Sequence, residues 1–385
     1  MKRHLFLCLL VLGSILSCTQ RGRKTHETME QNKNELYLLA GTYSTENNTG
    51  IYVYRFDQEK GTATYTSQEK AIKPSYLVVS SDERFVYSVG LDEEKKAIAN
   101  AFSFNKETGK LNLLNTQPTN AAGPCYINTD RNANFVVTAN YASGTVSIFP
   151  LRNDGYLDPV VRLLTFEGNG PDKNRQEHPH LHCVVFSPDE KFLYAEDLGS
   201  DQVHKFNVSQ NSPFLSPGDP DSFQVEPGSG PRHLTFHPNG NYAYLINELS
   251  GKVTAFRYDN GDLNAIQYIA SDTTAGVGSK GSADIHISPD GRFLYASNRL
   301  KSDGIAIFSI HPSDGTLTFA GYQPTGIHPR NFIITPNGKY LLVANKDSNN
   351  IQIFRIDPQT GLLTDTGNEI NNIDQPVCLK FIQSS

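Results

Sequence analysis

The sequence predicts an all-β fold, a seven-bladed β-propeller whose blades each contain four antiparallel strands. Three observations predict it. A polar turn followed by a strand that opens with an aromatic residue occurs six times, the opening aromatics lie 47 to 57 residues apart, and incomplete copies of the repeat stand at both ends. A repeat of this length built from short strands is typical of a propeller. The opening aromatics are Phe85, Phe135, Phe192, Tyr242, Phe293 and Tyr340.

Composition and charge agree with this fold and exclude one class of partner. The chain has 385 residues with 30 glycines and 21 prolines, which suits an all-β protein rich in turns. Its net charge is −6 and its pI is near 6.0. Because nucleic-acid-binding domains carry a basic surface, we expect no nucleic-acid partner. A closed ring leaves no sheet edge to cover, so we expect a monomer.

The first 17 residues are interpreted as a lipoprotein signal peptide. A short positive region at residues 2–4 precedes an apolar run at residues 5–16, which is too short to span a bilayer. The run ends in a sequence that resembles the bacterial lipobox, with cleavage before Cys18 and a lipid on its thiol; the alternative is an ordinary secretory signal. Residues 18–33 are polar and are expected to form a disordered tether. We therefore expect a lipid-anchored protein of the bacterial cell envelope, on the periplasmic or surface side of a membrane.

Residues 34–385 are expected to form the propeller, with strands A to D in each repeat. In the repeat around Tyr242, turn signals such as Pro-Asn-Gly and Asn-Gly separate the four strands. Strand A is expected at residues 232–236, strand B at 242–246, strand C at 252–258 and strand D at 264–270.

The two ends of this domain are expected to combine into the seventh blade. Residues 36–69 supply strands B, C and D but no A, whereas residues 376–382 read as an A strand without a blade. Joined, they close the ring and leave no exposed sheet edge.

Matching positions of the repeats are expected to place charged side chains around one mouth of the ring. Strands of a blade alternate in direction, so the start of A and the end of B lie on the same face. Guanidinium groups this close repel one another unless an anion lies among them, so the set predicts a site for an anionic ligand. Its members are His182, Arg232, Glu248, Arg299, Arg330 and Lys346, with Asp284 and His286 on the same side.

The cysteines predict no disulfide framework. Once Cys8 leaves with the signal and Cys18 carries lipid, an odd number remains, on three different repeats. We expect Cys125, Cys183 and Cys378 to be small buried side chains rather than nucleophiles.

Several motifs carry a resemblance to a known family. They are His180-Leu-His182, Gly230-Pro-Arg232-His233, Asn247-Glu248-Leu249, Ala283-Asp284-Ile285-His286 and Ser297-Asn298-Arg299. On these motifs the chain resembles the seven-bladed lactonase family, which includes bacterial propeller-type 6-phosphogluconolactonases and the fungal carboxymuconate lactonizing enzyme. The resemblance runs from about Leu36 to Phe381, and it implies that the active site contains His182, Arg232, Glu248 and Arg299.

The chain departs from the family pattern in two places. Tyr126 stands where relatives often have histidine, and we expect it to alter one wall of the mouth. The lipobox is the other departure, because the pentose-phosphate enzyme is expected in the cytosol. It bears on whether the substrate is phosphorylated more than on the chemistry.

The predicted function is hydrolysis of a sugar-acid lactone. Water attacks the ring carbonyl and an oxyanion develops, so the reaction needs a base and positive groups. His182 is the candidate base, and Glu248 either orients it or is itself the base. Arg232 and Arg299 are expected to hold the phosphate or carboxylate of the substrate and to stabilise the oxyanion. Further candidates for substrate binding are His180, Asp284, His286 and Arg330.

Three alternatives stay open beside this prediction. His180 and His182 share a strand face that zinc could use, but the arginines would repel a cation, so we expect no metal and no cofactor. A propeller can also be a non-catalytic surface module that binds anionic sugar acids. The third alternative is a muconate-type lactonizing, or cycloisomerase, reaction in the same charged mouth.

Overall fold

The computed structural model describes residues 34–43, 50–273 and 280–384. The signal peptide, the acylated Cys18 and the tether that the sequence predicts lie outside these residues. Within them, no helix has the length and apolar character needed to cross a membrane.

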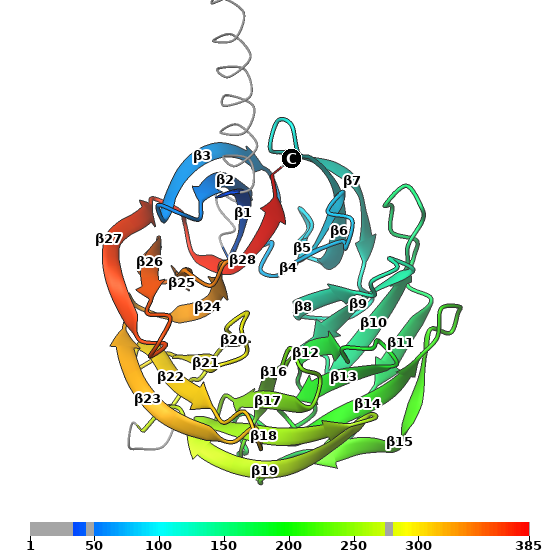
Figure 1. Cartoon of the computed structure of the whole chain (residues 1–385). Coiled ribbons are helices and arrows are strands. Elements are labelled where there is room, and N and C mark those ends of the chain that lie inside the picture. Colours follow the sequence, from blue (N-terminus) through cyan, green and yellow to red (C-terminus); the bar gives the residue numbers. More distant parts are fainter. Residues whose placement is uncertain (1–33, 44–49, 274–279, 385) are drawn as a thin grey trace, which may run out of the picture.

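Seven four-stranded antiparallel sheets surround a central axis, as the repeat predicts (Figure 1). From inner to outer strand, the first four blades are β28 (Pro376–Gln383), β1 (Glu35–Thr42), β2 (Ile51–Asp57) and β3 (Thr62–Glu69); β4 (Leu77–Val79), β5 (Phe85–Leu91), β6 (Ala97–Asn105) and β7 (Lys110–Pro118); β8 (Pro124–Thr129), β9 (Phe135–Asn140), β10 (Thr145–Pro150) and β11 (Arg162–Thr165); β12 (Leu181–Phe186), β13 (Phe192–Asp197), β14 (Gln202–Val208) and β15 (Leu215–Gln224). The other three are β16 (Pro231–Phe236), β17 (Tyr242–Asn247), β18 (Lys252–Asp259) and β19 (Asp262–Ala270); β20 (Ile285–Ile287), β21 (Phe293–Asn298), β22 (Gly304–Ile310) and β23 (Leu317–Pro324); β24 (Pro329–Ile334), β25 (Tyr340–Asn345), β26 (Asn350–Ile356) and β27 (Leu363–Asn371).

The ring closes by pairing its two ends, and this prediction is confirmed. Strand β28 runs antiparallel to β1, with Leu38 opposite Phe381, so the red and blue ends of the chain share one blade in Figure 1. The four strands predicted around Tyr242 correspond to β16–β19, and the main difference is that β19 begins at Asp262.

A side-chain hydrogen bond explains why the turn and the aromatic recur together. The Ser187 hydroxyl accepts the backbone N–H of Phe192 at 3.1 Å and donates to the Asp189 carboxylate at 2.7 Å. Thr335 accepts the N–H of Tyr340 at 3.0 Å in the same way. These bonds fix the hairpin between strands A and B and therefore the register of the blade.

Tyrosines two residues after an opening aromatic tie neighbouring blades together, as Tyr194, Tyr244 and Tyr295 do. The Tyr244 hydroxyl donates to the carbonyl oxygen of Gly315 at 2.8 Å, in the C–D turn of the next blade. Gly315 has a φ of +74°, and a Cβ there would lie 2.3 Å from the Tyr242 ring. This turn therefore requires glycine, which accounts for the repeated glycine before strand D.

Candidate active site at one mouth of the ring

A cavity of about 330 Å³ opens on the face where A strands begin and B strands end. The predicted register is therefore correct, because residues from several blades meet around this one cavity. Its charged and titratable lining residues include Lys73, Arg175, His182, Glu248, Arg299 and Arg330.

A repeated β-bulge directs several of these side chains. The pairing of β12 with β13 skips His182, and that of β24 with β25 skips Arg330. The same irregularity falls at Cys125 in β8 and at Arg232 in β16. A bulge leaves its extra residue unpaired and re-aims its side chain, so the second residue of these A strands is turned toward the axis of the ring.

Glu248 lies at the centre of a cluster of arginines. Its Oε2 accepts from Arg232 Nε at 2.9 Å and lies 3.1 Å from Arg299 Nη2, and its Oε1 accepts from Arg175 Nη2 at 2.7 Å. Burial acts to raise the pKa of the Glu248 carboxyl, but Arg299 and Arg232 outweigh it and hold that pKa well below its usual range. Glu248 is therefore an ionised carboxylate that holds three guanidinium groups in place.

Arg232 lies behind Glu248 and is not among the residues that line the cavity. Its side chain is 1% exposed, and its Nη1 donates to the carbonyl oxygen of Ala283 and lies 3.2 Å from His233 Nε2. His233 Nδ1 in turn donates to Asp284 Oδ1 at 2.8 Å. Burial and Arg232 lower the pKa of His233 to about 4, so it is neutral and its Nε2 accepts from Arg232. Asp284 and His233 thus fix the position of Arg232, which fixes Glu248.

His182 is a buried, neutral imidazole in the cavity wall. Burial, together with Arg232 and His233, holds its pKa well below the usual range. Its Nδ1 lies 3.9 Å from Cys125 Sγ. Among the described residues no hydrogen bond joins His182 to Glu248, so the structure does not show the pairing in which Glu248 orients this imidazole.

Arg330 and Lys73 are cations of the cavity that have no carboxylate partner in the described part of the chain. Arg330 Nη2 donates to the Tyr43 hydroxyl at 2.8 Å, and both cationic groups lie over the Tyr43 ring, 4.8 Å and 4.9 Å from its centroid. Sequence reasoning missed Tyr43 and Lys73. A signal for Tyr43 existed, because it directly follows β1 and so occupies the same position as Glu248 after β17.

Arg175 is the other residue that sequence reasoning missed. It lies in the connection between β11 and β12, within the longest spacing between consecutive opening aromatics, 57 residues, and this extra length was the available signal. The neighbouring Gln176 is fully buried and donates to the carbonyl oxygen of Leu198 at 2.9 Å and to Asp201 Oδ1 at 2.8 Å. This anchor holds Arg175 against the cavity.

Several predicted residues lie outside this cavity. Asp284 and His286 line a second cavity of about 380 Å³, and so does Tyr126, whose ring stacks on Tyr76 at 4.0 Å. The expectation that Tyr126 forms part of the first mouth is therefore wrong, because the preceding Cys125 lies there instead. His180 does not line either cavity, and Lys346 pairs with Asp347.

Cys183 and Cys378 are buried as expected, whereas Cys125 is only partly buried and lines the first cavity. Cys125, Cys183 and Cys378 are free. Burial raises the pKa of Cys125 to about 12, so its thiol stays protonated at neutral pH and is no nucleophile.

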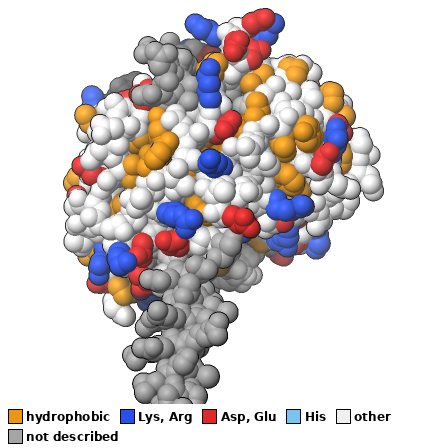
Figure 2. Space-filling model, turned by 90° about the horizontal axis from the view of Figure 1, so that it is seen from above, with side chains coloured by type: hydrophobic (Ala, Val, Ile, Leu, Met, Phe, Trp, Pro, Cys, Tyr) orange, Lys and Arg blue, Asp and Glu red, His pale blue; other side chains and the backbone are white. Residues whose placement is uncertain are grey.

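The cavity is positively charged although the chain is acidic. Four cationic side chains line it beside one carboxylate, whereas the whole chain has a net charge of −6. The outer wall differs: Figure 2 shows basic and acidic side chains interspersed there, with neither sign covering a large area. The charge imbalance belongs to the cavity and suits an anionic ligand.

Comparison with known proteins gives consistent results. A family described as "Lactonase, 7-bladed beta-propeller" matches residues 37–381. A 6-phosphogluconolactonase of Formosa agariphila is 41% identical over 334 residues, which are 85% of this chain and 94% of that protein. A 6-phosphogluconolactonase of Bacillus subtilis is 35% identical over 349 residues, 89% and 97% of the two chains.

Solved structures agree with these sequence matches. The crystal structure of a putative 6-phosphogluconolactonase from Bacteroides fragilis is similar with a TM-score of 0.87 and 54% identity, covering 91% of this chain and 99% of that one. The periplasmic gluconolactonase of Pseudomonas aeruginosa is similar with a TM-score of 0.86 and 33% identity, covering 91% and 100%.

Proposed function

Because the chain belongs to the lactonase family of seven-bladed β-propellers, we propose that it is a hydrolase that opens the ring ester of a sugar-acid lactone, as a 6-phosphogluconolactonase does. The observation that carries the proposal is the first cavity itself. It combines a neutral imidazole, His182, with an ionised carboxylate, Glu248, that is held by arginines. An ester hydrolase needs both a proton acceptor and positive charge where the oxyanion forms.

His182 is the proposed base. It is neutral, it lines the cavity, and no cation bonds to its ring nitrogens in the described residues. Glu248 is less suited, because three guanidinium groups occupy its oxygens. His182 takes a proton from water as the water oxygen bonds to the lactone carbonyl carbon. The ring C–O bond then breaks, the departing oxygen takes up that proton, and the new carboxylic acid releases its own proton to solvent.

The arginines divide into two roles in this proposal. Arg299, Arg330 and Arg175 face the cavity and offer guanidinium donors to the oxyanion and to an anionic group of the substrate. Burial lowers the pKa of Arg299 to about 9, so it remains charged at neutral pH. Arg232 is a positioning residue, since it holds Glu248 from behind.

The substrate class follows from the excess of positive charge. An aldonolactone that carries a phosphate or carboxylate complements Arg330 and Lys73, which pair with no carboxylate among the described residues. Some relatives are named for a phosphorylated lactone, and the Pseudomonas relative is a periplasmic gluconolactonase. Measuring the hydrolysis of lactones with and without a phosphate group therefore decides which kind is the substrate.

The test is proton release, recorded in a pH-stat with the purified mature chain. The substrates are glucono-δ-lactone and 6-phosphoglucono-δ-lactone, each with and without a chelator, and the uncatalysed hydrolysis rate is subtracted. We expect hydrolysis of at least one lactone to rise far above the uncatalysed rate. If no lactone of the panel is turned over although anionic sugar acids bind, the chain is a binding module and the proposal fails.

We also propose that a lipid on Cys18 anchors the protein, as a monomer, in the bacterial cell envelope. The lipobox-like sequence supports this location, and the periplasmic Pseudomonas relative is consistent with it. In fractionated cells the full-length chain is expected with the membranes, and Cys18→Ser in the soluble or uncleaved fraction. An unchanged membrane pool of processed Cys18→Ser protein would contradict the anchor.

A further inference from the structure

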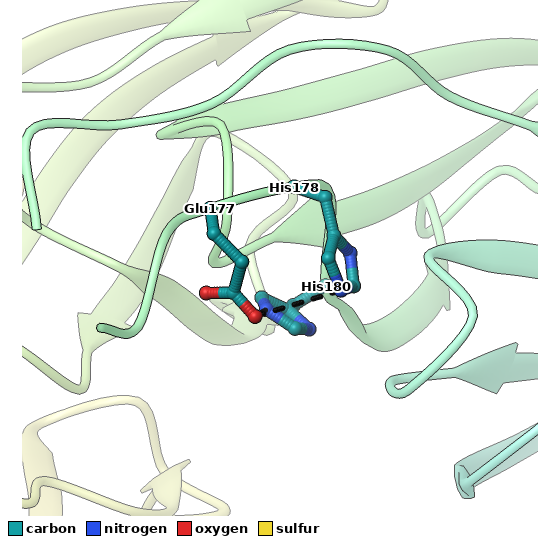
Figure 3. A group of neighbouring side chains, drawn as sticks. All are labelled: Glu177, His178 and His180. Carbon is teal, nitrogen blue, oxygen red and sulfur yellow. Dashed lines mark ion pairs between the residues drawn. The ribbon is translucent and has the colours of Figure 1, made fainter. Parts of the chain in front are cut away.

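Three side chains with metal-ligating atoms meet on the segment that carries Arg175. Figure 3 shows the carboxylate of Glu177 and the rings of His178 and His180 gathered together. One ligand atom from each lies within 4.8 Å of the other two. His180 lies just before β12, and its backbone N–H donates to Asp197 Oδ1 at 2.7 Å, so part of this group is fixed to the blade.

Both imidazoles present the same nitrogen to the carboxylate. His178 Nδ1 lies 2.8 Å from the carbonyl oxygen of Pro179, and His180 Nδ1 lies 2.9 Å from that of Tyr141. A carbonyl oxygen only accepts, so each Nδ1 carries a proton and Nε2 is the nitrogen left to ligate a metal. A histidine that ligates a metal through one nitrogen typically donates the other N–H to a carbonyl or carboxylate.

The separations between the ligand atoms favour a cation among them. Glu177 Oε1 lies 3.6 Å from His178 Nε2 and 3.4 Å from His180 Nε2. A direct hydrogen bond from an imidazolium to a carboxylate would be about 2.7–2.9 Å long. Two ligand atoms bound about 2.05 Å from a tetrahedral zinc ion lie about 3.4 Å apart. The two separations are thus longer than a direct hydrogen bond and match the spacing of ligand atoms around a shared tetrahedral ion.

We propose that Glu177, His178 and His180 bind a divalent transition-metal ion of the zinc class. Nitrogen and carboxylate oxygen are ordinary zinc ligands, and the set lacks the extra oxygens that calcium or magnesium require. The side chains of His178 and Glu177 are 45% and 48% exposed, so solvent reaches the ion and a water completes the tetrahedron.

This site differs from the zinc site that the sequence suggested. That idea paired His180 with His182, whereas the structure groups His180 with Glu177 and His178. Repulsion of a metal cation by arginines, which argued against the earlier site, is weaker here, because the guanidinium of Arg175 is paired with Glu248. The proposal therefore departs from the expectation that the protein uses no metal.

The bound ion would brace one wall of the first cavity. Glu177 is two residues from Arg175, and His180 bonds to the backbone of Tyr141, whose hydroxyl lies 3.3 Å from Arg175 Nη2. Fixing Glu177 and His180 to one ion therefore restrains Arg175 from two directions. The ion is not assigned a part in the chemical step.

The experiment is calorimetric titration of the tag-free mature chain with Zn²⁺, together with the visible absorption spectrum after addition of Co²⁺. We expect one equivalent of Zn²⁺ to bind, a rise in Tm, and the intense absorption of tetrahedral cobalt. In His178→Ala and Glu177→Gln the affinity should fall by at least about tenfold. His311→Ala, which removes an exposed histidine elsewhere, is the matched control and should bind like the parent.

Two results would overturn the proposal. One is the absence of Zn²⁺ binding by the folded parent chain, and the other is equal stoichiometry and affinity in the parent and in His178→Ala. Circular dichroism and the metal-free Tm of each variant show that it is folded. Because neither readout involves a lactone, failure of this site is distinguishable from failure of the proposed hydrolase activity.

Discussion

At the scale of single residues, the charge balance of the cavity depends on Glu248. The sequence predicted that this residue would lie among arginines, because matching positions of a repeat meet around the axis. It could not predict that Arg232 lies behind Glu248 rather than in the cavity wall. That arrangement results from hydrogen bonds of Arg232 to Ala283 and His233, which have no counterpart in the repeat.

Arg330 provides a test of anion binding, because its guanidinium has a phenol as its partner and no carboxylate in the described structure. Replacing it in Arg330→Gln should raise KM for a phosphorylated or carboxylated lactone by about tenfold or more, the loss of one charge-assisted hydrogen bond. KM for an uncharged lactone should change much less. The matched control is Arg292→Gln, an exposed arginine paired with Asp290. Equal effects on charged and uncharged lactones would contradict this role.

Glu196 predicts a pH dependence of stability. It is fully buried, and burial raises its pKa to about 8 from 4.5. Below about pH 4.5 both the folded and the unfolded states hold the proton. Between about 4.5 and 8 only the folded state keeps it, so stability falls as the pH rises, by up to about 5 kcal/mol.

Glu196→Gln should remove this loss of folding stability at higher pH, because glutamine resembles the protonated acid. The free energy of unfolding, measured by urea denaturation from pH 5 to pH 9, should therefore fall less steeply in Glu196→Gln than in the parent. Glu226→Gln is the control, since Glu226 is a surface residue paired with Lys252. Parallel curves for the parent and Glu196→Gln would show that this carboxyl is ionised in the folded state.

At the scale of strands and turns, position along the A strand explains which of the predicted residues line the first cavity. His182 and Arg330 occupy bulges at the second position of their strands, and counting from the opening aromatic finds that position. His286 lies three residues beyond the matching Ala283, about 10 Å farther along the strand, and so it reaches the second cavity. Tyr126 directly follows its bulge residue, Cys125. Because successive side chains of a strand point to opposite sides, Tyr126 points away from the first cavity.

Gly199, in the turn after β13, lets the segment with Arg175 pack closely against this turn, and a substitution tests whether that packing matters. A Cβ at this position would lie 1.8 Å from the carbonyl oxygen of His178, so Gly199→Ala must displace that backbone. We expect kcat/KM to fall by about tenfold and Tm to fall, since this misplaces groups of the cavity wall. Gly321→Ala is the control, because its Cβ would meet only the movable end of Leu362. Unchanged kinetics in Gly199→Ala would show that the position of this segment does not matter.

At the scale of the whole molecule, the sequence predicts the architecture well because the repeat contains its own register. A turn hydroxyl holds the opening aromatic, as Ser187 holds Phe192, and the tyrosine two residues later bonds to a glycine of the next blade, as in Tyr194, Tyr244 and Tyr295, so recognising one blade locates the others. Ring closure follows from the two incomplete copies. The contacts of the connection between β11 and β12, which carries Arg175, Glu177 and His178, were not predictable, because only its extra length marks this segment in the sequence.

The central claim is that the cavity with His182 and Glu248 hydrolyses a lactone, and kcat/KM of site variants tests it most directly. For the lactone that the parent hydrolyses best, Glu248→Gln and His182→Gln should each lower kcat/KM by about a hundredfold or more, with the folded structure retained by circular dichroism. Glu226→Gln should leave it unchanged. Values for both site variants within about twofold of the parent would place the chemistry elsewhere and contradict the account.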